Sequence, residues 1–388
     1  MRDRYLSSHI VRDIKEKMVF VSGPRQVGKT TLAKYLGSNF FKSYSYLNWD
    51  YQPDRKTIIK SELPSNTKLL IFDELHKYKN WKNYIKGIFD KHKNDFYILL
   101  TGSARLDIYR KGGDSLAGRY HQYILHPFSL AELLELKINN KLFYKLFFSE
   151  NINGYKILET LIKYGPFPEP CLKKDDAHWR RWQIEKNERL IKEEIRDLTT
   201  IEDLSAIQIL VELLPSKVGL PLSVNNLRED LEVAHKTLVN YLRVLELFYF
   251  HFRIYPYSKK TVRSLKKMAK LYLWDWSVIN NEGVRFENLI ASHLLKYAHF
   301  LKNSQGYKAQ LHYLRDSEGR EVDFLFTIDD KPWFAVEVKL DEEKSYLDYY
   351  QQRLGIPFVY QVVKKSGIDY LKKGIRIISA DKFLTAFV

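Results

Sequence analysis

The segment Gly23–Thr30, Gly-Pro-Arg-Gln-Val-Gly-Lys-Thr, constrains this chain more than any other stretch. It fits G-x-x-x-x-G-K-[ST], the pattern of a loop that cradles the phosphates of a nucleoside triphosphate. An apolar run, Met18–Val21, precedes it, and Thr31–Leu36 follows with the composition of a helix. Gly23 and Gly28 allow a tight turn, and a helix N-terminus adds partial positive charge. The sequence therefore predicts a strand, a phosphate-binding loop and a helix, in that order.

We expect this loop to bind ATP, with Mg²⁺ as the second cofactor. Lys29 is expected to reach the β- and γ-phosphates, and Thr30 is expected to hold Mg²⁺. The predicted nucleotide-binding residues are Gly23, Pro24, Arg25, Gln26, Val27, Gly28, Lys29, Thr30 and Thr31.

A second nucleotide signal follows in Lys68–Glu74, an apolar strand that ends in two carboxylates. A buried strand brings its terminal acids to the carboxyl edge of a parallel sheet, where ligands bind. We expect Asp73 to help hold Mg²⁺ and Glu74 to orient and deprotonate the attacking water. This pair favours hydrolysis of ATP rather than binding alone.

Further elements are predicted around these two motifs: strands at 43–48 and 96–101, and an amphipathic helix at 81–92. An inserted strand between the phosphate-loop strand and the Asp-Glu strand is typical of ATPases that use a glutamate. In such enzymes a polar residue on the neighbouring strand senses the γ-phosphate, and Thr101 or Ser103 would hold that place. The alternative is an ordinary exit from a strand through turn residues.

The region as a whole resembles the AAA+ ATPases, and more closely an uncharacterised prokaryotic AAA-type group with an uncharacterised C-terminal domain. The resemblance rests on Gly23–Thr31, Asp73-Glu74 and three later segments: Thr101–Leu106, Asp114–Tyr120 and His126–Leu133. It implies an arginine finger that neutralises γ-phosphate charge, and Arg105 or Arg119 could serve. The alternative for each is a structural arginine paired with a carboxylate. A finger supplied across a subunit boundary would require a homo-oligomer.

Composition bounds the remaining possibilities. A chain of 388 residues exceeds what one core supports, so two to four domains are expected. The net charge of +16 suggests a polyanionic partner, DNA first, although a genome rich in A/T codons would also supply many lysines. The single Cys171 excludes an internal disulfide and a cysteine-based zinc site. We expect a cytoplasmic protein without a membrane partner, because neither a signal-peptide core nor an 18-residue apolar run is present.

We predict a multidomain α/β protein: a P-loop parallel-sheet ATPase core (1–130), a helical lid or connector (131–200), a winged helix-turn-helix (201–262) and a restriction-endonuclease-like α/β domain (263–388). Apolar residues at helical spacing predict helices over Leu133–Phe148 and Trp179–Leu198. Between them, three prolines in Gly165–Pro170 predict a rigid, non-helical corner, either the hinge of a lid or a packing hinge.

Two helices with a short turn, Ser223–Leu231 and His235–Glu246, predict the helix-turn-helix, with a wing strand over Phe248–Tyr255 and a basic turn over Pro256–Lys260. The second helix would offer His235, Lys236, Thr237 and Asn240 to a DNA major groove. The alternative is a packing or protein-docking module.

Three spaced elements resemble the PD-(D/E)xK endonuclease core: Glu287 on a helical run, Asp323 in Glu321–Phe326, and Glu337 with Lys339 in Trp333–Leu340. Strand alternation places Glu337 and Lys339 on one face. Asp323 and Glu337 could hold Mg²⁺, Lys339 could orient water, and Glu287 would complete the cluster. The alternatives are a DNA clamp and a silent relic.

Three hypotheses about function follow. The first is an ATPase that controls a DNA-associated C-terminal module. The second is a slow nucleotide-dependent switch or scaffold for a protein partner. The third is an ATP-gated metal-dependent DNA endonuclease.

Overall fold

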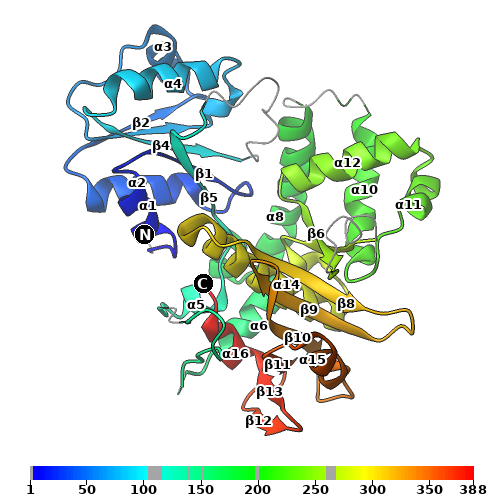
Figure 1. Cartoon of the computed structure of the whole chain (residues 1–388). Helices are drawn as coiled ribbons and strands as arrows, with labels where there is room; N and C mark the ends of the chain where they lie inside the picture. The colour runs from blue at the N-terminus through cyan, green and yellow to red at the C-terminus, as the bar shows by residue number, and fades with distance from the viewer. Residues whose placement is uncertain are drawn as a thin grey trace. The chain divides into compact units, whose positions relative to one another are not determined.

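The computed structural model describes residues 3–103, 116–137, 140–150, 152–196, 201, 203–258 and 268–388 (Figure 1). The chain divides into two compact units. The first unit is Met1–His126 with Leu247–Tyr249, and the second is Pro127–Glu246 with Phe250–Val388.

A five-stranded parallel sheet forms the first unit, with the strand order β2-β3-β4-β1-β5. Strand β4 therefore lies between β1, which leads into the phosphate loop, and β3, which ends at Asp73. This is the inserted strand that the sequence indicated. The strands are β1 Met18–Ser22, β2 Tyr44–Asn48, β3 Leu69–Asp73, β4 Tyr97–Gly102 and β5 Tyr120–Ile124.

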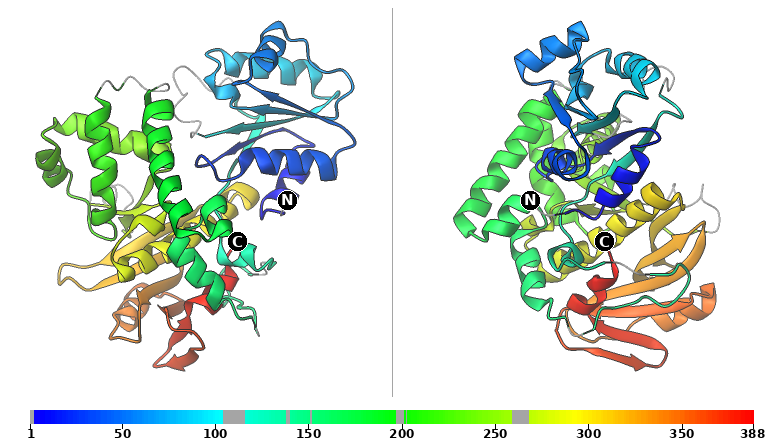
Figure 2. Two further views of the ribbon diagram at one scale, coloured as in Figure 1. Left: turned by 180° about the vertical axis from the view of Figure 1, so that it is seen from behind. Right: turned by 90° about the vertical axis from the view of Figure 1, so that its left-hand side faces the viewer.

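Helices cover both faces of this sheet (Figures 1 and 2). Alternate residues of the central strands point to opposite faces, and Phe20, Phe72 and Leu100 join Ile58 of α3 and Ile85 of α4 in one apolar core. Every residue of β1 and β3 is buried, as expected for central strands of a parallel sheet. The helices are α1 Ser7–Asp13, α2 Lys29–Phe40, α3 Gln52–Lys60 and α4 Trp81–His92, with a 3₁₀ turn at Leu75–Lys77.

The second unit begins with short helices. The expected helix over Leu133–Phe148 is wrong, because the helix there, α5, covers only Leu130–Leu133 and residues 140–150 are not helical. Phe148 instead packs against the rings of Tyr360 and Phe383 of the C-terminal sheet region. The apolar residues of this segment are thus buried by contacts distant in sequence rather than along a helix stripe.

The proline-rich corner is also shorter than expected. Helix α7 begins at Pro168, because a proline at the first helical position lacks only an N–H that needs no partner there. Gly165 remains outside the helices with a φ of +77°. The helices are α6 Tyr155–Tyr164, α7 Pro168–Lys173 and α8 Asp176–Arg189, which continues as a π-helical turn at Leu190–Ile195.

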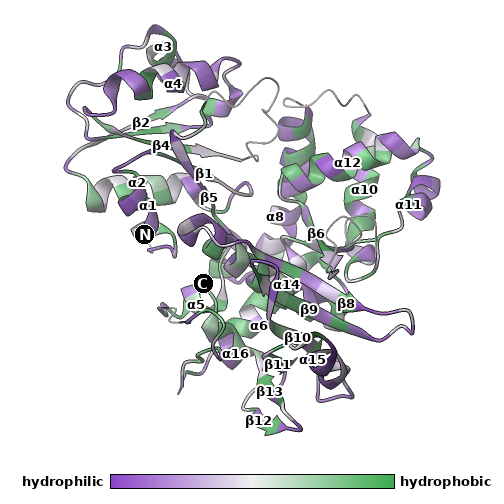
Figure 3. Ribbon diagram, viewed as in Figure 1, coloured by the Kyte–Doolittle hydropathy of each residue, from purple (hydrophilic) through white to green (hydrophobic). Residues whose placement is uncertain are grey.

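Two helices joined by a short turn follow, at the positions that the sequence predicted. Ser223 caps α11 (Val224–Leu231) through its hydroxyl, and Glu232 ends that helix in a left-handed conformation. Helix α12 (His235–Leu247) buries Leu238, Leu242 and Leu245, and Figure 3 shows the alternation of hydrophobic and hydrophilic residues along it. Preceding them are α10 Leu204–Leu213 and a 3₁₀ turn at Leu214–Lys217.

An eight-stranded mixed sheet completes the second unit, in the order β12-β13-β11-β10-β9-β8-β6-β7. The expected wing strand is β6, which pairs with β7 and so belongs to this sheet; Lys259 and Lys260 lie outside the described residues. The strands are β6 His251–Pro256, β7 Lys270–Leu273, β8 Ala309–Arg315, β9 Glu321–Ile328, β10 Lys331–Lys339, β11 Phe358–Val363, β12 Asp369–Lys372 and β13 Ile375–Ser379.

Alternation along β9 and β10 explains how both faces of this sheet are covered. Leu325 and Ala335 pack with α15 residues on one face. On the opposite face Phe326 stacks on Phe334 and contacts the ring of Tyr297. The remaining elements are α14 Glu282–Gln305, α15 Leu347–Leu354, α16 Ala380–Phe383 and 3₁₀ turns at Trp276–Val278 and Leu384–Ala386.

Candidate functional site

The phosphate loop joins β1 to α2 with the backbone geometry that its sequence predicts. Gly23 has a φ of +152°, and a Cβ there would overlap the carbonyl oxygen of Leu125. Gly28 has a φ of +96° and stands directly before Lys29, the first residue of α2. Both glycines are thus required by conformation, and Gly23 also by close packing.

Two cationic side chains hold the loop in shape. Lys29 Nζ donates to the carbonyl oxygens of Gly23 and Pro24, each at 2.9 Å. The Arg4 guanidinium donates to the carbonyl oxygens of Val27 at 3.1 Å and His126 at 2.6 Å. The sequence did not identify Arg4, because it lies 23 residues before Val27 and outside any recognisable motif.

Asp73 at the end of β3 accepts hydrogen bonds from three hydroxyl groups. Thr30 Oγ1 lies 2.7 Å and Tyr46 Oη 2.6 Å from Asp73 Oδ2, and Thr101 Oγ1 donates to Oδ1. Burial and the hydrogen bond to Asp73 raise the pKa of the Tyr46 phenol, so the phenol stays a donor. The structure thus brings together the predicted residues Thr30, Asp73 and Thr101, and adds Tyr46, which sequence reasoning missed.

Glu74 follows in a left-handed conformation with a φ of +55°. Its amide donates to the carbonyl oxygen of Thr101 at 3.1 Å, which fixes its position beside β4. Its Oε2 lies 3.4 Å from Nε2 of the buried His76. Burial lowers the pKa of His76 to about 3, with smaller contributions from Lys77 and Lys29, so the imidazole beside Glu74 is neutral.

Ser103, Arg105 and Arg119 are the other residues predicted to contact the γ-phosphate. Ser103 is buried just beyond β4. Arg119 forms a bidentate pair with Asp90 at 2.8 and 3.1 Å, and its carbonyl oxygen bonds to Met18 at the start of β1. Arg119 therefore lies where β1 begins, at the end of the sheet away from the phosphate loop. Its role as an arginine finger remains a prediction, and it would have to act on the nucleotide of a second subunit. Arg105 lies outside the described residues.

The predicted acids of the second unit, Glu287 on α14, Asp323 on β9 and Glu337 on β10, form what we call the acidic cluster. Besides burial, the charge of Asp323 raises the pKa of both other carboxyl groups. Burial, then the charge of Asp323, raises the pKa of Glu287 to about 7. Burial also raises the pKa of Asp323 and of Glu337. Although burial opposes it, the charges of Glu337 and Asp323 raise the pKa of Lys339, whose Nζ lies 3.5 Å from Glu337 Oε1.

A buried lysine on β7, Lys270, also belongs to this acidic cluster. Its Nζ lies 2.5 Å from Glu321 Oε1 and 3.7 Å from Glu287 Oε1. Tyr272, two residues later on the same strand, donates to Glu287 Oε1 at 2.6 Å. The alternating Lys-x-Tyr pattern was the available sequence signal, and it was missed.

The carboxylates of this acidic cluster are already engaged by protein groups. Asp323 Oδ2 accepts from the amide of Val338 at 2.8 Å, and Glu337 Oε2 accepts from Ser345 at 2.7 Å. Across the part of the chain that the structure describes, no group of three or more His, Cys, Asp or Glu side chains is arranged to hold a metal ion. Metal binding by Glu287, Asp323, Glu337 and Lys339 stays a prediction, and these side chains would have to rearrange to allow it.

The predicted DNA-contacting residues lie mostly on one exposed side of α12. His235, Lys236 and Asn240 are exposed, whereas Thr237 is half-buried. Arg243, also exposed, extends this side by one turn. Contact between these positions and DNA stays a prediction.

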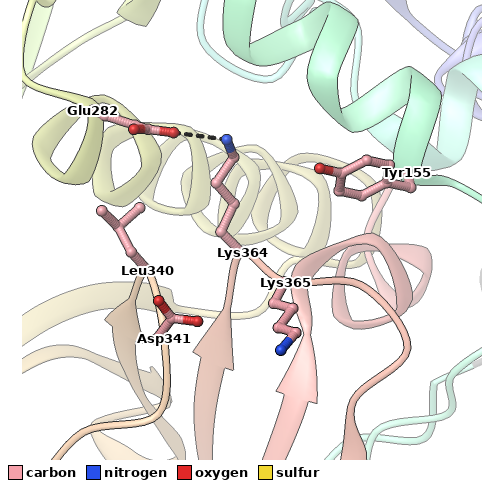
Figure 4. A pocket seen from close by; sticks show the side chains of 6 residues that line it. All are labelled: Tyr155, Glu282, Leu340, Asp341, Lys364 and Lys365. Atoms are coloured by element: carbon pink, nitrogen blue, oxygen red, sulfur yellow. Dashed lines mark hydrogen bonds and ion pairs between the residues drawn. The ribbon is translucent and has the colours of Figure 1, made fainter.

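A cavity of about 350 Å³ lies just beyond the strand that carries Glu337 and Lys339 (Figure 4). Lys364 reaches Glu282 at 2.7 Å and Glu159 at 3.3 Å, so its charge is compensated. The two lysines face two carboxylates among the lining residues, which are Tyr155, Glu282, Leu340, Asp341, Lys364 and Lys365. The cavity is therefore polar, but its side chains neutralise one another.

Comparison with protein families divides the chain in three. Residues 15–134 match the AAA domain, residues 155–284 match a domain of unknown function (DUF8612), and residues 282–381 match another domain of unknown function (DUF4143). The first match covers the phosphate loop, Asp73 and Glu74. No helix in the described ranges is long and apolar enough to cross a membrane.

Similar whole chains add little about function. Two proteins of Methanocaldococcus jannaschii, both named as uncharacterized, are 26% and 25% identical; the matches cover 86% and 88% of this chain and 78% of each relative. The Thermotoga maritima RuvB Holliday junction branch migration motor is 18% identical, with 67% of this chain and 92% of that chain covered, at a TM-score of 0.32. A TM-score of this size does not establish a common fold for the whole chain.

Proposed function

We propose that the first unit binds MgATP and hydrolyses it, and that this reaction controls a DNA-associated second unit. One observation carries the ATPase proposal: Asp73 accepts hydrogen bonds from Thr30 at the phosphate loop and from Thr101 on the inserted strand. The ends of β3 and β4 and the first turn of α2 thus bring their polar residues to one point. The match of residues 15–134 to the AAA domain supports the same reading.

The loop residues fit a nucleoside triphosphate. The glycine conformations at 23 and 28 allow backbone N–H groups to face phosphate oxygens, and α2 adds the positive end of its dipole. Lys29 would exchange its two carbonyl acceptors for phosphate oxygens. Thr30 and Asp73 supply the hydroxyl and carboxylate oxygens that suit Mg²⁺, and the bound ion would neutralise phosphate charge.

Glu74 would take the proton of the attacking water. Its carboxylate stands at the end of β3, directly after Asp73 and beside the neutral His76. His76 is uncharged, and the ammonium of Lys77 lies 4.0 Å from Glu74 Oε2. Thr101 would respond to the γ-phosphate by redirecting the hydroxyl that now bonds to Asp73.

Steady-state ATP turnover of the wild type and Glu74→Gln tests this proposal. Loss of the general base should lower kcat by roughly 100-fold or more, while ATP binding persists. Glu62→Gln, which changes an exposed carboxylate (68% exposed) of the same unit, is the matched control and should turn over normally. A Glu74→Gln protein that turns over at the wild-type rate would refute the assignment.

Turnover with and without duplex DNA separates the first two hypotheses. An ATPase that acts on DNA should hydrolyse ATP faster when DNA is present. A slow switch or scaffold that binds a protein partner should ignore DNA. The exposed side of α12, with Lys236, Asn240 and Arg243, supports the DNA alternative, and Lys236→Ala with Asn240→Ala should weaken duplex binding if that side makes the contact.

The clustering of Glu287, Asp323, Glu337 and Lys339 supports the third hypothesis, an ATP-gated endonuclease. Lys270 weighs against it, because its ammonium already supplies positive charge to Glu287 and Glu321. Supercoiled DNA with Mg²⁺ or Mn²⁺ is the direct substrate. Cutting that persists in Asp323→Ala would show that this site is not responsible.

A further inference from the structure

A cavity of about 510 Å³ lies in the second unit between the end of β8, the end of β6 and helix α15. Three tyrosines and two arginines contribute to its lining. Those that matter here are Tyr257, Tyr313, Arg315, Asp316, Tyr350 and Arg353. None of them belongs to the predicted DNA-contacting side of α12 or to the predicted nuclease residues.

The tyrosine rings are fixed parts of the wall. Tyr313 donates its hydroxyl to the carbonyl oxygen of Met268 at 2.8 Å, and Tyr350 donates to the carbonyl oxygen of Arg320 at 2.9 Å. Both rings are buried, and Tyr257 packs partly buried against the same apolar cluster as Tyr350. Tyr313 and Tyr350, each 4% exposed, therefore form the wall of the cavity, and the partly buried Tyr257 is the ring that a ligand can reach.

The lining is also positively charged. Arg315 and Arg353 have side chains that are 47% and 53% exposed, whereas Asp316 is 9% exposed. The Asp316 carboxylate is paired with Arg320 at 2.7 Å and with Arg353 at 3.6 Å, and Arg353 Nη1 also donates to the Tyr349 hydroxyl at 2.5 Å. Arginine presents five N–H donors in a planar fork that matches a phosphate group, so both lining arginines retain donors for a ligand.

We propose that this cavity binds one nucleotide of a single-stranded nucleic acid, with its base against the ring of Tyr257 and its phosphate on Arg315 and Arg353. The volume lies in the range of pockets that hold small ligands of this size. Aromatic rings bind bases of any sequence through their faces, and arginine binds the phosphate. The proposal rests on the proposed association of the second unit with DNA. It adds that the second unit binds a single, unpaired strand.

The cavity adjoins the acidic cluster. Arg315 Nη1 lies 3.4 Å from Glu321 Oε2, and Glu321 is also the closest partner of Lys270. The Lys270 ammonium lies 5.6 Å from the ring centroid of Tyr313. A strand held in the cavity would therefore pass next to the carboxylates of Glu321, Glu287 and Asp323, with Arg315 and Lys270 between.

Fluorescence anisotropy of the full-length protein tests the proposal, with a fluorescein-labelled oligothymidine strand and a duplex of equal length as probes. Tyr257→Ala should weaken binding of the strand by about five- to 100-fold, the range for loss of one stacked base, whereas Tyr257→Phe keeps the ring and should bind normally. Arg315→Gln with Arg353→Gln should weaken binding of the strand at least tenfold. Lys302→Gln with Lys331→Gln removes the same charge from exposed positions outside the cavity and should change binding less than threefold.

The outcomes distinguish this proposal from the one on which it rests. Strand binding that survives the arginine pair and Tyr257→Ala, or falls equally in the lysine control, overturns the cavity as the site. A wild type that binds the duplex but not the strand overturns the cavity and leaves DNA association standing. A wild type that binds neither probe refutes DNA association itself.

A competition arm separates a nucleic acid strand from a free nucleotide as the source of the ligand. Thymidine monophosphate should displace the labelled strand only at concentrations far above those at which the unlabelled strand does so, because it offers one phosphate and one base. Displacement at equal concentrations would overturn the strand as the occupant.

Discussion

Glu287→Gln should stabilise the second unit in a pH-dependent manner. Glu287 lies on α14 with its side chain only 19% exposed, close to Asp323 and hydrogen-bonded by Tyr272. Burial, then the charge of Asp323, raises its pKa from 4.5 to about 7 in the folded chain. The substitution removes the charge but keeps an oxygen that can accept the Tyr272 hydrogen bond.

The sign follows from proton binding. Between pH 4.5 and about 7 the folded state holds more protons at this position than the unfolded state, so the free energy of unfolding decreases as pH rises through this window. At about 1.4 kcal/mol for each pH unit, the full loss is about 3 kcal/mol. Glutamine carries no such loss, so the variant and the wild type should be similar in stability at pH 4.5, and the variant should be more stable by roughly 2–3 kcal/mol at pH 8.

Urea denaturation of the full-length protein at several pH values from 4.5 to 8.5 measures this difference. Hydrogen exchange of peptides from β9 and β10 assigns the transition to the second unit. Glu229→Gln, at a carboxylate that is 70% exposed on α11, controls for the removal of one negative charge. The reasoning is refuted if the gap between wild type and Glu287→Gln fails to widen as pH rises.

Three further variants test individual contacts, one at the nucleotide site and two in the second unit. Tyr46→Phe removes a charge-assisted hydrogen bond to Asp73 and should lower the kcat for ATP about tenfold; a change below twofold would mean that Tyr46 does not position the carboxylate. Gly165→Ala should cost about 2–4 kcal/mol in urea denaturation, because φ is +77° and the new Cβ would lie 2.6 Å from Asp275 Oδ1; an unchanged midpoint would contradict this. Lys186→Met should cost about 3–5 kcal/mol by leaving the buried Asp275 carboxylate without its 2.5 Å partner, and adding Asp275→Asn should recover part of the loss.

Local sequence determined the ATPase core well, for a physical reason. The phosphate loop is a run of eight residues, and its conformation depends on two glycines within that run and on the apolar strand directly before it. Asp73 and Glu74 could be placed because a buried strand must end at the ligand-binding edge of a parallel sheet. The strands β1 to β4 and helix α4 accordingly lie where the sequence predicted them.

The helix predicted over Leu133–Phe148 from helical periodicity is wrong, because apolar residues at this spacing can also be buried against distant parts of the chain. Leu146 and Phe148 are buried, and Phe148 packs against rings from β11 and α16. Such contacts join positions more than 200 residues apart, and no window of sequence contains them.

By itself, the sequence determined which backbone segments would carry charge: the phosphate loop, the Asp-Glu strand end, and the acidic strands β9 and β10. Only the tertiary structure decided which groups those charges meet. Tyr46 joins Asp73, Lys270 enters the acidic cluster, and Tyr257, Arg315 and Arg353 surround one cavity. The electrostatic free energy of a side chain depends on its distance from other charges and on its burial, and both are set by the folding of segments that are far apart in the sequence.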